Sequence, residues 1–164
     1  MGSLFRNVYS WLKDFYGNNL YEYFKGWNCG AESYTNSNQF LTIGLITATI
    51  ALFIVVLFYY IIDSPRFYRW WCWLIMLGVV AVSTLLFGYG KAYSDLNGGK
   101  IEDCLLYIIE YDEQGNINEK TQQIWDSNCW EFGNANLIIG VSFFILFSFC
   151  LKWWSKSAKH SPFF

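Results

Sequence analysis

The stretch FLTIGLITATIALFIVVLFYYII, residues 40–62, determines the class of this 164-residue chain. It contains no charged residue and no Pro, Asn or Gln. As a helix it reaches about 34 Å, which is enough to cross a hydrocarbon core of about 30 Å with some tilt. A helix on the surface of a soluble protein shows a polar face, and this run has none. We therefore predict a transmembrane span at residues 40–62.

Two further apolar runs, residues 70–89 and 135–154, are also predicted to span the membrane. The first has no charge, and the short loop 63–69 before it requires an antiparallel helical hairpin. The run 135–154 has an apolar centre of only about 22 Å, which its flanking residues extend to about 30 Å. For this third run, a re-entrant or buried soluble helix is the alternative.

The predicted fold class is therefore an all-α membrane protein with three transmembrane helices. An N-terminal amphipathic helix and a small extramembrane loop domain complete it, and a β-hairpin is one expectation for that domain. The composition agrees, with 54% hydrophobic, 22% aromatic and 15% charged residues. A bilayer accommodates so many rings, because Phe suits its centre and Trp and Tyr suit its boundaries. No basic stripe indicates nucleic-acid binding. The expected partners are the lipid bilayer and other membrane proteins or copies of the same chain.

Residues 1–39 form an N-terminal segment in which residues 3–16 have the spacing of an amphipathic helix. One interpretation is a helix that lies at the membrane interface or binds a partner. The other is a helix packed on the protein's own loop. The expected interfacial anchors are Leu4, Phe5, Val8, Trp11, Leu12 and Phe15 here, Trp70, Trp71 and Trp73 at the start of the second span, and Trp153 and Trp154 at the end of the third.

The long polar region 90–134 contains most of the acidic residues. Residues 105–111 and 117–125 have β-forming composition on either side of a turn signal at Gly115, which predicts a hairpin. An isolated two-stranded ribbon is marginally stable in water. We therefore expect the N-terminal aromatic segment to support it.

Charge distribution predicts the orientation. Three spans place the loop 63–69 and the basic tail 155–164 on one side, and the N-terminal segment and the acidic loop on the other. Positive residues gather on the cytoplasmic side. This predicts a bacterial inner-membrane protein with its N-terminus outside and its C-terminus in the cytoplasm.

Three of the five cysteines, Cys29, Cys104 and Cys129, fall on the predicted outer side, where disulfides persist. A hairpin that turns near Gly115 would bring Cys104 and Cys129 together at its base, and a bridge there would stabilise it by about 2–4 kcal/mol. Cys29 would then be free or would bridge two copies. Cys72 and Cys150 are expected to be small apolar residues within spans.

No arrangement of residues indicates catalysis or metal binding. The single histidine, His160, lies in the polar tail. The adjacent acids at 102–103 and 112–113 are expected to form a solvated surface rather than a cation site. The spans contain no Asp, Glu, Arg or His, which argues against ion-coupled transport by one copy. We expect no enzyme activity, no cofactor and no metal.

Small residues at helical spacing form a smooth stripe on each of the first two spans, and such stripes let helices approach closely. The stripes consist of Gly44, Thr47, Ala48 and Ala51 on the first span and of Gly78, Ala81, Thr84 and Gly88 on the second. They are expected to pack on each other within one chain. The alternative is that the first stripe meets another copy or a different membrane protein.

These surfaces favour a non-catalytic membrane subunit or scaffold of a multi-protein envelope assembly, such as the membrane complex of a secretion apparatus. One alternative is an oligomeric membrane-permeabilising effector, holin-like or defence-linked. A further alternative is a membrane immunity protein that binds an incoming toxin, which the sequence does not separate from the first.

Overall fold

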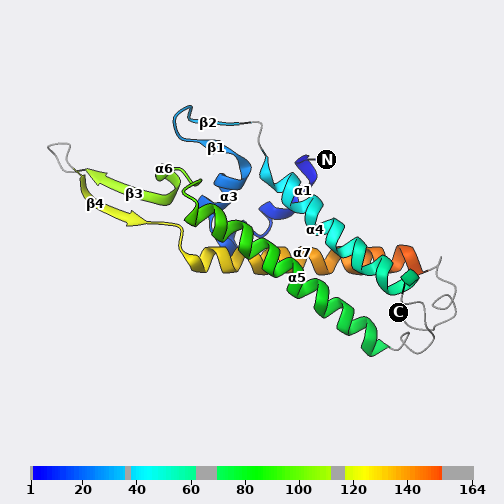
Figure 1. Cartoon of the computed structure of the whole chain (residues 1–164). Helices are drawn as coiled ribbons and strands as arrows, with labels where there is room; N and C mark the ends of the chain where they lie inside the picture. The colour runs from blue at the N-terminus through cyan, green and yellow to red at the C-terminus, as the bar shows by residue number, and fades with distance from the viewer. Residues whose placement is uncertain (1, 36–37, 62–69, 112–116, 153–164) are drawn as a thin grey trace. The chain divides into compact units, whose positions relative to one another are not determined.

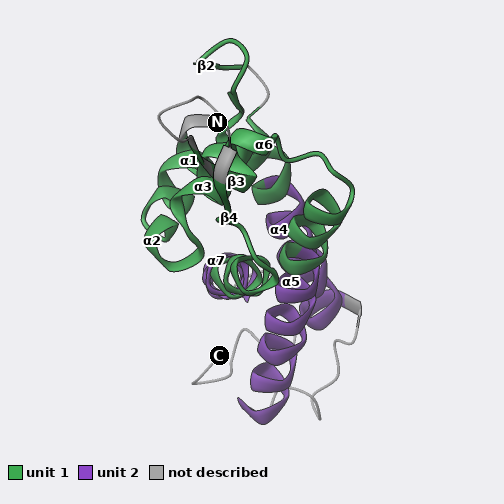
Figure 2. Cartoon of the chain, turned by 90° about the vertical axis from the view of Figure 1, so that its left-hand side faces the viewer, with its two compact units in different colours: residues 1–44, 88–135 green, residues 45–87, 136–164 purple. Residues whose placement is uncertain are grey.

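The computed structural model describes residues 2–35, 38–61, 70–111 and 117–152 (Figure 1). The chain divides into two compact units (Figure 2). Unit 1 contains Met1–Gly44 and Gly88–Ala135, and unit 2 contains Leu45–Phe87 and Asn136–Phe164. Each unit is therefore built from segments that are distant in the sequence.

Three helices are long and apolar enough to cross a membrane, as the sequence predicts. They are α4 (Gln39–Val56), α5 (Trp70–Asn97) and α7 (Asp126–Lys152), and α4 continues as a π-helical turn, η1 (Leu57–Ile61). The apolar windows of the three spans have mean hydropathies of 2.7, 2.1 and 2.0.

Two of these helices extend well beyond the predicted spans. Helix α5 continues from residue 89 to Asn97, and α7 starts at Asp126 rather than at 135. At about 1.5 Å per residue, each helix reaches about 40 Å and exceeds the hydrocarbon thickness. An apolar run measures only the part of a helix that suits lipid, so it misses the polar turns that continue into unit 1.

The N-terminal segment is helical but not continuous. It forms α1 (Gly2–Ser10), α2 (Lys13–Tyr16) and α3 (Asn18–Lys25), so the single helix predicted at 3–16 is broken after Ser10. Tyr9 and Tyr16 are both buried, and the Tyr16 hydroxyl donates a 3.1 Å hydrogen bond to the Tyr9 carbonyl. Helix α3 ends at Gly26, which has the left-handed backbone (φ 91°) that glycine tolerates.

Unit 1 has an aromatic core. Phe132 of α7 contacts Tyr9, Tyr16 and Phe24, with ring centroids 5.9, 5.1 and 4.6 Å away. Phe40 of α4 stacks on Tyr9 at 4.9 Å. Because these rings are buried, the N-terminal segment packs on the chain's own helices through one face.

The remaining elements of unit 1 are short. Strands β1 (Trp27–Asn28) and β2 (Ser33–Tyr34) pair with each other, and α6 (Asp103–Leu106) leads into the antiparallel pair β3 (Tyr107–Tyr111) and β4 (Ile117–Gln122). The predicted β-hairpin is therefore present, in a register that joins Tyr107 to Gln122. Residues 105 and 106, which were predicted to begin the first strand, belong to helix α6 instead.

Unit 2 is held by side chains from all three long helices. Ala51 and Val55 of α4, Val80 of α5 and Phe144 of α7 form a buried cluster with residues of η1. Apolar burial cannot drive association between helices in lipid, so close packing of such small and branched residues is the main attraction.

Candidate functional site

Parts of the small-residue stripes lie at buried contacts, and their neighbours there differ from those expected. A β-carbon at Gly44 would lie within 2.6 Å of three atoms of the Phe5 ring, so α1 approaches α4 there. Thr84 instead faces Gly140 of α7, a residue outside the predicted stripes. The other stripe residues range from buried (Thr47, Ala51 and Gly88) to partly buried (Ala48, Gly78 and Ala81).

A buried polar network joins the three long helices within unit 2. The Asn136 amide donates a 2.7 Å hydrogen bond to the Thr84 carbonyl, and its oxygen accepts one of 2.9 Å from the Thr47 hydroxyl. All three residues are fully buried. In the sequence, Asn136 was interpreted only as a flank of the third span. A lone amide at the edge of an apolar run is the signal that points to such a contact.

The predicted interfacial anchors divide into two groups. Phe5 is buried against α4, and Val8 and Leu12 are partly buried. Leu4, Trp11 and Phe15 are 59%, 86% and 50% exposed and remain able to enter a membrane interface. At the start of α5, Trp70 and Trp71 are exposed and Trp73 is partly buried, whereas Trp153 and Trp154 lie outside the described residues.

A second aromatic group was missed. Tyr89 lies against Tyr93 and Trp130, with ring centroids 5.4 and 5.5 Å apart. Along α5, Tyr89 lies about 29 Å from Trp70, which is close to the hydrocarbon thickness. Rings at this spacing are typical of the two boundaries of one bilayer.

The disulfide differs from the predicted one. Cys104 is bonded to Cys29, with α-carbons 6.3 Å apart, whereas Cys129 is a buried free thiol. The predicted Cys104–Cys129 pairing is therefore wrong. The reason is that Cys104 is an exposed residue of α6, which precedes the hairpin, whereas Cys129 is buried in the first turns of α7. Of the two predicted apolar cysteines, Cys72 is partly buried and Cys150 is exposed.

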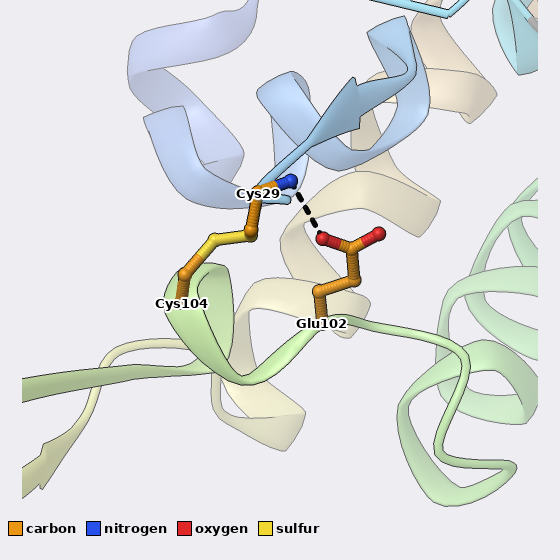
Figure 3. A group of neighbouring side chains, drawn as sticks. All are labelled: Cys29, Glu102 and Cys104. Carbon is orange, nitrogen blue, oxygen red and sulfur yellow. Dashed lines mark hydrogen bonds between the residues drawn. A yellow bond between two sulfur atoms is a disulfide. The ribbon is translucent and has the colours of Figure 1, made fainter. Parts of the chain in front are cut away.

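Glu102 lies beside this disulfide (Figure 3). One of its carboxylate oxygens, Oε2, accepts a 2.7 Å hydrogen bond from the Cys29 backbone N–H. The two sulfur atoms and a Glu102 oxygen all lie within 4.8 Å of one another. Glu102 and Cys104 are exposed, and Cys29 is partly buried. The group is therefore open to solvent and to small reagents.

A half-open cavity of about 230 Å³ adjoins Glu102 within unit 1. Its lining consists of Tyr23, Gly26, Trp27, Asn28, Thr35, Gln39, Lys100 and Glu102. Lys100 is held by a 3.1 Å ion pair with Asp95, whose side chain is 1% exposed and also pairs with Lys91. The ammonium groups thus compensate the buried carboxylate of Asp95.

The charge state of Tyr23 in this cavity follows from its burial. Desolvation raises the pKa of Tyr23, and Asp95 raises it further, while a hydrogen bond with Gln39 acts in the opposite direction. The phenol is therefore neutral at physiological pH and acts as a hydrogen-bond donor. The cavity offers hydrogen bonds, one ammonium and one carboxylate, an arrangement that suits binding of a small polar group.

Comparison of the chain with protein-family models, with curated proteins and with solved structures finds no match.

Proposed function

We propose that this protein is a non-catalytic membrane subunit of a multi-protein envelope assembly, in which unit 1 docks a partner through the β3–β4 hairpin. The membrane is a bacterial inner membrane, with unit 1 on its outer side. The observation that carries the proposal is that Glu110 of β3 lies directly opposite Glu119 of β4.

Like charges directly opposite each other destabilise a strand pair. Both carboxylates are exposed, and the nearby Lys120 lies over the Tyr107 ring at 3.8 Å. Since side chains alternate along a strand, Glu110 and Glu119 lie on one face and Tyr107 and Lys120 on the other. The acidic pair therefore suits a positively charged partner group.

The acidic face also has an apolar component. Ile108 lies two residues before Glu110, on the same face, and is 50% exposed. Among the described strands, β3 and β4 pair only with each other, so each has an outer edge that can accept another strand. A partner that supplies basic groups and an apolar contact would stabilise a ribbon that is marginal by itself.

Charge reversal tests this docking face. Glu110→Lys places a cation opposite Glu119, which favours the isolated hairpin, but it repels a basic partner. We expect this variant to fold and to lose its partner after extraction in mild detergent, as measured by native mass spectrometry. Asp14→Lys is the matched control, because it makes the same charge change at an exposed site on α2.

Two outcomes would contradict the proposal. One is a wild-type chain that extracts as a lone 19.2 kDa protein without partners. The other is an assembly that Glu110→Lys and Asp14→Lys affect equally.

A second candidate is an oligomeric membrane-permeabilising effector. It is favoured by Gly78 of α5, where a β-carbon would meet nothing within 4 Å, so another helix has room to approach. Dye entry into cells after induced expression tests it: intact membranes at high expression would exclude this function.

A further inference from the structure

We propose that Cys29, Cys104 and Glu102 bind a zinc ion when the disulfide is reduced. The site then connects the β1–β2 loop to the start of α6 in both redox states, by a disulfide when oxidised and by a metal when reduced. From the sequence we expected no metal site, and Cys29 and Cys104 lie 75 positions apart, so no local motif joins them.

The first argument is geometric. Cys29 directly follows β1, and Glu102 and Cys104 flank the first residue of α6. Their ligand atoms already lie within 4.8 Å of one another (Figure 3). Tetrahedral zinc with Zn–S bonds of about 2.3 Å holds two sulfurs about 3.8 Å apart. The thiolates therefore need only a modest separation after the S–S bond breaks.

The second argument concerns the carboxylate. The Cys29 N–H holds Glu102 through Oε2, the carboxylate oxygen that lies on the side of the disulfide in Figure 3, and this oxygen keeps a second lone pair for a metal. Hydrogen bonds of this kind orient the ligands of protein metal sites. Two thiolates and one carboxylate are ligands that zinc accepts, and the exposure of the group leaves a fourth position for water.

The chemistry balances with a dithiol reductant. The dithiol supplies two electrons and two protons, the Cys29–Cys104 bond breaks, and the reductant becomes a disulfide. Binding of Zn²⁺ then releases two protons as two Zn–S bonds form. The exposed Cys104 gives the reductant access.

Cobalt provides a spectroscopic test, because tetrahedral Co²⁺ bound to thiolates gives charge-transfer and d–d absorption bands. The full chain in detergent is reduced, freed of reductant without oxygen, and titrated with Co²⁺ and then with Zn²⁺. We expect one Co²⁺ per reduced chain, displacement by Zn²⁺, and no band for the oxidised chain. Cys29→Ser and Cys104→Ser should abolish the charge-transfer band, whereas Cys150→Ser, which removes another exposed thiol, should retain it.

Glu102→Gln tests the carboxylate and leaves the disulfide in place. We expect it to weaken Co²⁺ binding by at least about tenfold, the smallest loss typical of residues that support a metal site. Asp103→Asn is the control, since it neutralises the adjacent exposed acid. The proposal is wrong if the reduced wild type gives no charge-transfer band, if that band survives in Cys29→Ser, or if Glu102→Gln and Asp103→Asn bind Co²⁺ equally.

Discussion

Two glycines show how strongly the effect of an added methyl group on stability depends on the surrounding atoms. A β-carbon at Gly140 would lie 2.5 Å from the Thr84 hydroxyl oxygen, whereas one at Gly78 would meet nothing within 4 Å. We predict that Gly140→Ala destabilises the helix bundle by about 1–3 kcal/mol, as overpacking does. Gly78→Ala should be neutral or stabilise it by up to about 1 kcal/mol, because alanine favours the helix. Reversible unfolding in mixed detergent micelles measures both, and equal effects would contradict the packing.

Asn136 gives a second prediction for a single residue. Asn136→Ala removes the hydrogen bonds to Thr47 and Thr84, so we expect a loss of about 1 kcal/mol, within the range for polar contacts between membrane helices. Ser142→Ala is the control on the same helix, because Ser142 is exposed and bonds only locally, to the Ile138 carbonyl. If both variants unfold alike, the network does not stabilise the bundle.

Among the elements, the β1–β2 loop depends most on a single bond. The Cys29–Cys104 disulfide joins positions 75 residues apart, and a loop of that length corresponds to about 4.5 kcal/mol in the chain-entropy model. We predict that Cys29→Ser, measured with a chelator present so that no metal replaces the bond, makes unit 1 unfold at a lower temperature and exposes the β1–β2 loop to protease. Cys150→Ser should behave as wild type, and protection of the loop in both variants would contradict this role.

At the scale of the whole molecule, the orientation of the chain in the membrane can be tested. If all three long helices cross the bilayer, unit 1 lies on one side, and residues 62–69 and the C-terminal tail lie on the other. With unit 1 outside, a membrane-impermeant maleimide should label Cys29 and Cys104 in intact cells only after a reductant is added. A variant without these two cysteines controls for the remaining thiols. Labelling that occurs only after cell lysis would show that the orientation is the opposite one.

The predictions from sequence were best where a property is local. The run at 40–62 contains enough apolar length to indicate a span without any partner, and the β-forming composition on either side of the turn signal at Gly115 indicates a hairpin. The disulfide prediction failed because it assumed that Cys104 belongs to the hairpin. Cys104 instead lies on α6, within reach of Cys29, and no local pattern records that approach.

The sequence by itself therefore determined the class of the molecule: three apolar helices, an aromatic N-terminal segment and an acidic hairpin. These follow from residue composition and periodicity, which act over a few turns of chain. Only the tertiary structure decided which groups meet, namely Phe5 with Gly44, Asn136 with Thr47 and Thr84, and Cys29 with Cys104 and Glu102. Such contacts depend on how separate segments pack, because an amide or a thiol finds its partner across space rather than along the chain.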